Sequence, residues 1–390
     1  MNTTLRRAWL ATAVWFVLNA FGMASFIVRL PEVKRLLGVS NSTLGLSLFV
    51  ASLGSLVAIR FAGRLAAKHG SSPVMLVGAV ACAGLLPLVT AMSSIPFFVL
   101  SLCLFVSSVT TMDVAMNAHA VTIEHESSKL IMGRLHGLWS VGGIAGGLIG
   151  GLFSSLNVSL QLHGFVLAAA SLAFIAIFRS YLLPATADIH EPDAETEKPH
   201  KLPNIFYFLG LVGLCAAILE GSASDWGAIL ITDEFGATGL VSALPYIVFQ
   251  SAMVVGRFSS DQLTAKFGRA TILTCCGMLA FVGLASGLLV GGPVAIVVAW
   301  FSIGAGASVV IPMVFSLAGS IAKRDHAGVL APSRAVATVT GISYSAFMIG
   351  PPTIGLLADV VSLRWAMLVP ALLALGVVAG GLFARKYENS

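Results

Sequence analysis

Hydrophobic residues along this chain gather in twelve continuous stretches, and each stretch is long enough to cross a lipid bilayer as a helix. They do not alternate with polar residues at every second position, as the strands of an outer-membrane barrel would. The pattern therefore predicts an all-α membrane protein with twelve transmembrane helices. The first stretch is too long for the apolar core of a signal peptide, so we expect it to remain as the first helix. The expected spans are residues 8–30, 43–63, 73–93, 97–122, 132–155, 161–183, 203–230, 239–260, 270–290, 293–318, 333–358 and 363–384.

One long polar segment interrupts this series between the sixth and seventh spans. Residues 184–202 hold several acidic side chains, lysines and prolines, a composition typical of a linker. The linker divides the chain into an N-terminal half, residues 1–183, and a C-terminal half, residues 203–390, with six expected helices in each.

The two halves contain a short internal repeat. Leu65-Ala-Ala-Lys-His-Gly70 follows the second span, and Leu263-Thr-Ala-Lys-Phe-Gly268 follows the eighth; four of their six residues match. An Arg-Phe pair precedes each copy at nearly the same distance. A repeat at equivalent places indicates gene duplication and two pseudo-symmetric halves.

Composition and charge agree with this arrangement. The chain is 57% hydrophobic and only 10% charged, whereas soluble domains carry about 25% charged residues. When the N-terminus is placed in the cytoplasm, most of the 22 Lys and Arg residues also fall on that side. The positive-inside rule then predicts cytoplasmic termini, and we expect the protein in the bacterial inner membrane. The formal net charge of +5 reflects this topology and does not indicate nucleic-acid binding.

The sequence contains no recognisable catalytic or cofactor motif. All five cysteines lie in apolar stretches without metal-ligand spacing, so we interpret them as packing residues. A phosphate-binding loop and a nucleophile–base–acid set are both missing from the sequence. We therefore expect no enzymatic activity, no metal and no cofactor.

A loop motif follows the second and eighth spans. The second copy contains Gly256-Arg257-Phe258-Ser259-Ser260-Asp261 and Gly268-Arg269, while the first, Gly63 to Ser72, has Ala67 where the motif has an acid. On this motif the whole chain resembles the major facilitator superfamily. The resemblance implies secondary transport by alternating access, with a substrate site near the midplane between the halves. It also implies gating roles for Arg64, Arg257, Asp261 and Arg269, with a weaker charge latch in the first half.

Four further segments are similar to a bacterial branch of that superfamily, the YbjJ-like proteins, which are distantly related to fucose–proton symporters. They specify the branch and not the substrate. The segments are Asp113-Val-Ala-Met-Asn117, His136-Gly-Leu-Trp-Ser140-Val-Gly-Gly143, Glu220-Gly-Ser-Ala-Ser-Asp225-Trp226 and Gly350-Pro-Pro-Thr-Ile-Gly355.

Asp113 is the first candidate for proton coupling. A carboxylate at this depth costs at least roughly 2.5 kcal/mol and usually faces a watery cavity or a partner. Thr110, Asp113, Asn117 and Glu124 follow at helical spacing along one face. An apolar environment disfavours the ionised form, so Asp113 could bind and release a proton. Fucose-type symporters use an acidic residue on this helix, which implies the same role.

Two points about this helix stay open. Asp113 could instead be a structural carboxylate that pairs with a buried donor such as His136 or Arg334. Glu124 lies beside His125 and Glu126, so we expect it to be a solvated loop charge.

Glu220 is the second candidate for proton coupling and also for substrate binding. Glu220 and Asp225 are five residues apart, so an unbroken helix would aim them at different faces, but Gly221 and Gly227 could allow a break. Trp226 could stack on a sugar ring or anchor the helix at the outer interface. Alternatively, Glu220 makes an inter-helix hydrogen bond that holds the outer gate closed.

Several other polar or aromatic residues are candidates for substrate binding. Asn19 and Gln250 lie at the centres of their spans, and each amide has a donor and an acceptor for a hydroxylated solute. Each could equally hold helices together. Together the predicted substrate-binding residues favour a polar solute: Asn19, Asn117, His136, Trp139, Glu220, Asp225, Trp226, Gln250 and Tyr344.

Glycine and proline patterns predict how two helices pack. Rows of glycine at every fourth position in span 132–155, such as Gly142, Gly146 and Gly150, should allow close packing between the halves. Pro351 and Pro352 should bend span 333–358.

The sequence therefore favours a proton-coupled secondary transporter, acting as a monomer in the lipid bilayer, that moves protons and a small polar, sugar-like solute. One alternative is proton-driven export of drugs or metabolites on the same fold. An alternative of another class is a non-transporting membrane sensor, which the short linker and the lack of an added soluble domain disfavour.

Overall fold

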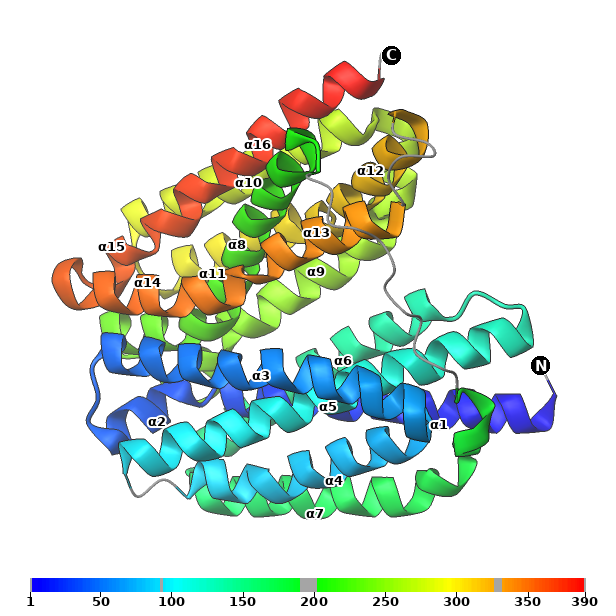
Figure 1. The fold of residues 1–390 in the computed structure, drawn as a ribbon. Coiled ribbons are helices and arrows are strands. Elements are labelled where there is room, and N and C mark those ends of the chain that lie inside the picture. The colour runs from blue at the N-terminus through cyan, green and yellow to red at the C-terminus, as the bar shows by residue number, and fades with distance from the viewer. Residues whose placement is uncertain (1, 92–93, 190–201, 326–331, 389–390) are drawn as a thin grey trace. The chain divides into compact units, whose positions relative to one another are not determined.

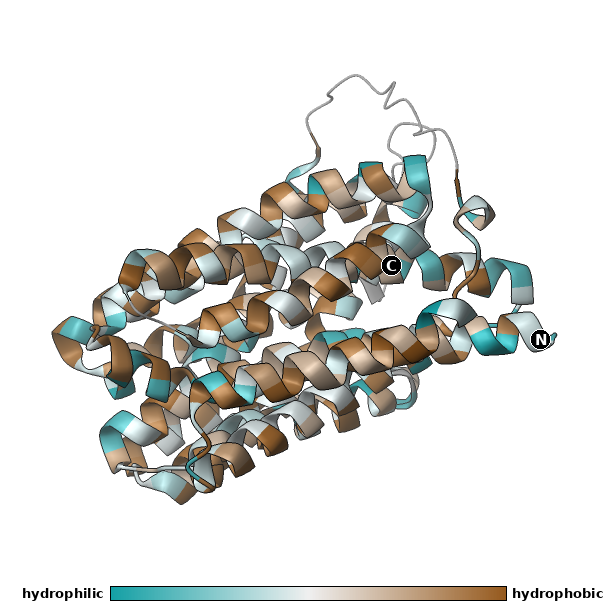
Figure 2. Ribbon diagram, turned by 90° about the horizontal axis from the view of Figure 1, so that it is seen from below, coloured by the Kyte–Doolittle hydropathy of each residue, from teal (hydrophilic) through white to brown (hydrophobic). Residues whose placement is uncertain are grey.

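The computed structural model describes residues 2–91, 94–189, 202–325 and 332–388, and these residues form helices without any strand. Twelve of the helical spans are long and apolar enough to cross a membrane, which confirms the predicted number. Hydrophobic residues occupy most of each helix, and hydrophilic residues gather toward the helix ends (Figure 2).

The described chain forms two compact units. The first comprises Met1–Val39, Ser47–Thr196 and Thr238–Ala243, and the second comprises Ser40–Leu46, Glu197–Ala237 and Leu244–Ser390. Two helices, α3 and α9, therefore each place their first residues in one unit and the remainder in the other.

The bounds of the helices follow, and Figure 1 labels most of them. In the N-terminal part of the chain they are α1 (Thr3–Ile27), α2 (Leu30–Leu37), α3 (Asn41–His69), α4 (Ser71–Thr90), α5 (Ile95–Ser127), α6 (Met132–Ser155), α7 (Leu160–Phe178), η1 (Arg179–Tyr181) and η2 (Ala185–Ala187). In the C-terminal part they are α8 (Asn204–Phe235), α9 (Leu240–Phe267), α10 (Arg269–Val290), α11 (Pro293–Ala307), α12 (Val310–Asp325), α13 (Pro332–Tyr344), α14 (Ala346–Val361), α15 (Leu363–Ala366) and α16 (Leu368–Glu388).

Two of the predicted spans are interrupted helices. The tenth span divides into α11 and α12 at Ser308, and the eleventh divides into α13 and α14 at Ser345. At both points the serine hydroxyl donates to the carbonyl three residues earlier, on Ala305 at 2.8 Å and on Ile342 at 2.6 Å. Such side-chain bonds compete with the helical ladder. The interruption of the eleventh span thus precedes Pro351, which lies inside α14.

The short helix α2 was not predicted. It starts with Pro31 in its first turn and ends at Gly38, whose φ of 62° is the left-handed conformation that glycine adopts readily. The helix has too few apolar residues to resemble a span. It is held by Arg29, whose guanidinium donates to Glu32 and to the carbonyl of Val158, and contacts Nδ1 of His163 at 3.1 Å.

Close helix packing through glycine occurs within the first unit. A Cβ on Gly142 or Gly150 would approach the carbonyl oxygens of Val17 or Ser25 in α1 to 2.5 Å, so only glycine allows this contact. This row therefore packs α6 against α1 of its own half, whereas Gly151 of the parallel row faces Leu240 and Ala243 of α9, which belong to the C-terminal half of the chain. Without a hydrophobic driving force inside a bilayer, such close contact holds helices together.

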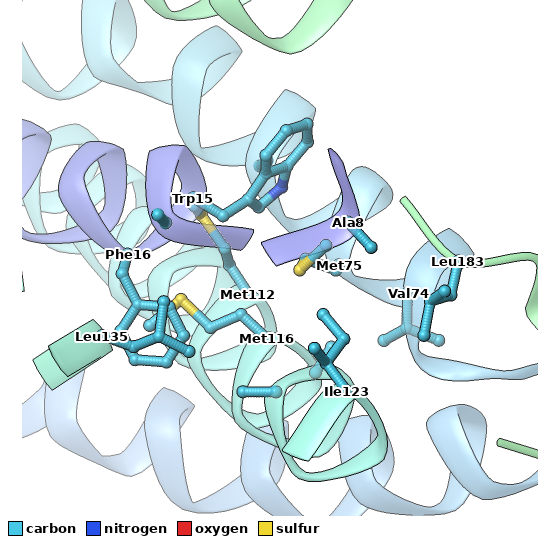
Figure 3. Close-up of a cluster of buried hydrophobic side chains, with 14 of the residues drawn as sticks. Ala8, Trp15, Phe16, Val74, Met75, Met112, Met116, Ile123, Leu135 and Leu183 are labelled. Carbon is cyan, nitrogen blue, oxygen red and sulfur yellow. The ribbon is translucent and has the colours of Figure 1, made fainter. Parts of the chain in front are cut away.

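Core packing in the first unit determines which face of α5 is buried, and so on which side of the helix Asp113 lies. Met112 and Met116 are fully buried and pack between Trp15, Phe16 and neighbouring residues (Figure 3). Because these two methionines lie one turn apart, they fix which face of α5 enters the core. Asp113 follows Met112 on the adjacent face and is only partly buried.

Two helix starts are capped by side chains from elsewhere in the same unit. In the second unit, Asp359 of α14 accepts hydrogen bonds from the backbone N–H groups of Asn41 and Ser42, each at 3.1 Å. In the first unit, Ser155 of α6 accepts from the backbone N–H of Leu240 at 2.7 Å. These contacts satisfy N–H groups that a helix leaves unpaired at its start.

Two further caps involve acidic residues near the ends of helices. Glu124 accepts from the backbone N–H groups of Ile131 and Met132, at 2.7 and 3.1 Å, and so caps α6. Glu124 was predicted to be a solvated loop charge; it is partly exposed, but it lies on α5 and not in a loop. Asp188 likewise accepts from the backbone N–H of Ser71 at 3.0 Å, at the start of α4.

Candidate functional site

In the first unit, three polar side chains follow one face of α5, as the sequence predicts. Thr110, Asp113 and Asn117 are all partly buried. The amide of Asn117 donates to the Asp113 carboxylate at 3.3 Å and to the Asp113 backbone carbonyl at 2.9 Å. The Thr110 hydroxyl donates to Ser55 of α3 at 3.0 Å. Asp113 is thus a membrane carboxyl group supported by one amide donor from the next turn.

Asn19 of α1 and Trp139 of α6 are hydrogen-bonded to each other. The indole Nε1 of Trp139 donates to Asn19 Oδ1 at 3.0 Å, and Asn19 Nδ2 donates to the carbonyl of Val109 at 3.0 Å. Only 3% of Asn19 is exposed. Its amide therefore joins α1, α5 and α6, which favours the helix-holding interpretation of this residue.

His136 lies on α6, one turn before Ser140. Its ring packs edge-on against Phe16, with the ring centroids 5.4 Å apart. The Ser140 hydroxyl donates to the His136 backbone carbonyl at 3.2 Å. His136 itself is exposed, and one edge contact of its ring is with Phe16 of the buried core.

In the second unit, an ion pair joins α8 and α9. Nη2 of Arg257 donates to Oε1 of Glu220 at 3.3 Å, and the two side chains are 35% and 21% exposed. Arg257 was expected to belong to the loop motif, yet its guanidinium reaches a carboxylate in the middle of α8. This pairing is the inter-helix contact that the sequence left as an alternative for Glu220.

A second polar pair lies beside these charges on α9. Nε2 of Gln250 donates to the hydroxyl of Tyr246 at 3.1 Å, and both side chains are buried. Sequence reasoning selected Gln250 and missed Tyr246, although a tyrosine one helical turn from a central glutamine was a usable signal.

The break that Gly221 and Gly227 could allow in α8 does not occur. Helix α8 is continuous from Asn204 to Phe235. Gly227 instead makes room for Trp300 of α11, whose Nε1 donates to the carbonyl of Ala223 at 2.9 Å. Trp226 is fully buried, with 0% exposure, and its Nε1 has no hydrogen-bond partner among the described residues.

Tyr344 belongs to a partly exposed aromatic group at the junction of α13 and α14. It is 48% exposed and contacts Phe315 and Phe347, with ring centroids 6.2 and 5.9 Å apart. Phe347 in turn packs beside Gly221 of α8, one residue from Glu220. The sequence-predicted tyrosine is therefore available on the surface of the unit and connected to the helix that carries the ion pair.

The remaining gating residues lie near helix ends. Arg64 is exposed on α3, and Arg269 is the first residue of α10 and partly buried. The side chain of Asp261 lies outside the described part of the structure.

In the ranges that the structure describes, no group of three or more His, Cys, Asp or Glu side chains could hold a metal ion.

Comparisons with known proteins agree on one family. The model of the Major Facilitator Superfamily matches residues 12–331. An uncharacterised MFS-type transporter of Yersinia pestis is 31% identical over 376 residues, which cover 95% of this chain and 94% of that protein. The membrane protein MosC of Rhizobium meliloti is 26% identical over 369 residues, covering 94% of this chain and 87% of that one.

Solved structures show the same fold at low sequence identity. The inward-facing, unoccupied crystal structure of a bacterial homologue of the human lysosomal transporter Spinster has a TM-score of 0.72 and 12% identity, covering 99% of this chain and 98% of the other. The nucleoside transporter NupG has a TM-score of 0.73 and 12% identity, covering 99% of this chain and 100% of the other.

Proposed function

Because this chain belongs to the major facilitator superfamily and is a multi-pass membrane transporter, we propose that it couples the movement of a small polar, sugar-like solute to the movement of protons. It does so by alternating access, with its termini in the cytoplasm and its helices in the bacterial inner membrane. The observation that carries the proposal is the presence of partly buried carboxyl groups within membrane helices of both units, at Asp113, Glu220 and Asp225.

Asp113 is the proposed proton carrier of the first unit. Its environment is apolar on the side of Met112 and Met116, and the described donor to its carboxylate is the amide of Asn117. A neutral amide does not neutralise a carboxylate, so protonation is the route by which this group loses its charge. Asn117 can support both states, because an amide has a donor and an acceptor.

Glu220 is the proposed switch of the second unit. While Glu220 is ionised, it holds the guanidinium of Arg257 on α9. Protonation removes the negative charge, and Arg257 is then released to interact with water or solute. Because Arg257 stays charged at all physiological pH values, the state of the pair depends on the proton bound to Glu220. Proton binding would thus change a contact between two helices.

The solute is proposed to be polar because neutral hydrogen-bonding groups lie beside these charges. Tyr246 and Gln250 bond to each other on α9, the helix that also carries Arg257, and Asn117 bonds to Asp113. Hydroxyl and amide groups of this kind suit a hydroxylated solute. Tyr344, with the partly buried Trp139 as a further candidate, would supply aromatic surface for a ring, whereas the fully buried Trp226 would have to become exposed first.

Proton flux in proteoliposomes tests this function. The purified protein is reconstituted with a pH-sensitive dye inside the vesicles, and sugars and polyols are then added outside one at a time. Symport predicts acidification of the lumen with the correct solute. Alkalinisation would instead indicate antiport and the export alternative. A protein that binds a solute, by a rise in melting temperature, but moves neither solute nor protons would be a sensor.

A further inference from the structure

A small cavity lies at the beginning of α1, away from the carboxyl groups described above. It has a volume of about 250 Å³ and is lined by Thr3, Arg6, Arg7 and Leu10 of α1 and by Tyr181 of η1. The chain after α7 returns to lie beside the start of α1 (Figure 1). All of these residues belong to the first unit.

The polar side of this cavity is positively charged. Arg6 and Arg7 are both exposed, and the first turn of α1 contains no acidic residue. Among the residues that the structure describes, no carboxylate forms an ion pair with either arginine. The guanidinium of Arg7 lies 5.7 Å from the centroid of the Tyr181 ring, which holds it at the edge of the cavity. Two guanidinium groups favour a phosphate-type anion, which they can bind through paired hydrogen bonds.

The other side of the cavity continues into an apolar, aromatic row. Tyr181 contacts Phe178 edge-on at 6.0 Å, and Phe178 stacks on Phe174 at 6.4 Å. Phe174 is 47% exposed, and Ile177, three residues further along α7, is 59% exposed. The row runs from the end of α7 into the part of the helix that spans the membrane, so its exposed surface is available to an acyl chain.

From these contacts we propose that the cavity binds the anionic headgroup of a phospholipid, with an acyl chain along Phe178 and Phe174. A soluble anion would use the two arginines but not the aromatic row, whereas a neutral lipid would use the row but not the arginines. An anionic phospholipid matches both sides. It would tie the start of α1 to the segment after α7 at the membrane surface.

Lipid binding to the purified full-length protein tests the proposal. Native mass spectrometry or microscale thermophoresis in detergent would compare phosphatidylglycerol, phosphatidylcholine and inorganic phosphate. We expect phosphatidylglycerol to bind at least tenfold more tightly than phosphatidylcholine, since each basic residue at the surface favours anionic lipid. We expect inorganic phosphate at millimolar concentration to compete weakly. Equal binding of the two lipids, or full competition by phosphate, would overturn the lipid assignment.

Variants locate the site. The double variant R6Q/R7Q should weaken phosphatidylglycerol binding by about tenfold or more, whereas R6K/R7K keeps the charge and should retain most of it. The matched control is R385Q/K386Q, which removes two exposed charges at the end of α16 and should leave the affinity unchanged. Replacing Phe174 with Ser should reduce affinity for long-chain more than for short-chain lipid. Unchanged binding in R6Q/R7Q that still purifies as a folded protein would contradict the site.

Discussion

Arg257 contacts Glu220 across 3.3 Å, and this ion pair joins α9 to the centre of α8. The pair connects Arg257 of the loop motif with Glu220, which the sequence selected as a candidate for proton coupling. In the bilayer each of the two charges would be costly without the other. The contact therefore predicts that the two side chains behave as a unit.

A double-mutant cycle tests this coupling. E220Q and R257Q each leave one charge without its partner, whereas E220Q/R257Q removes both. We expect the double variant to unfold at a higher temperature than the sum of the single losses predicts, with an interaction energy of about 1 kcal/mol because both side chains are partly exposed. Strictly additive losses would show that the pair is not formed in the membrane.

The cap on α3 gives a second prediction. D359A removes the acceptor for two backbone N–H groups at the start of α3 and should cost about 1 kcal/mol of stability. D359N should lose less, because the amide oxygen can still accept one hydrogen bond. Thermal unfolding in detergent measures both, and E126A serves as control since Glu126 is an exposed carboxylate on α5. Equal melting temperatures of D359A and the wild type would refute the cap.

A substitution of Asn19 distinguishes its two possible roles, which are holding helices together and binding the solute. N19A breaks two partly buried hydrogen bonds and leaves the Trp139 indole without its acceptor, which should cost roughly 1–3 kcal/mol. W139F should recover part of that loss in the N19A background. If Asn19 binds the solute instead, N19A would raise KM and leave the melting temperature nearly unchanged.

Cysteine labelling tests the predicted membrane topology. The five cysteines are free thiols and can be replaced to give a cysteine-free background. In that background, Ile189→Cys in the linker should resist a membrane-impermeant maleimide in intact cells, because we place the linker in the cytoplasm. Arg35→Cys, exposed on α2, should be labelled from outside. The reverse pattern would invert the proposed orientation.

The sequence predicted the helices far better than their contacts. Long apolar runs determine the twelve spans directly, because the bilayer requires that length. The interruptions at Ser308 and Ser345 could not be predicted, since single serines within apolar runs are common and most of them lie in continuous helices. Short α2 was missed for the opposite reason, as too few of its residues are apolar.

The candidate site shows the same limit. Helical spacing placed Asp113 and Asn117 on one face correctly. It could not show that Arg257 reaches Glu220 or that Trp139 uses the oxygen of Asn19, because these contacts join different helices. The side chain of Asp261 lies outside the described part of the structure, so its gating role stays a prediction.

Asp113 carries the central claim, and one comparison tests it most directly. D113N preserves shape and hydrogen bonding but cannot carry a proton. In proteoliposomes we expect D113N to exchange labelled solute across the membrane at a rate close to that of the wild type, and to fail to accumulate solute when a pH gradient is imposed. E126Q, a change of the same type at an exposed position of α5, should accumulate normally. Accumulation by D113N in response to the gradient would contradict the account.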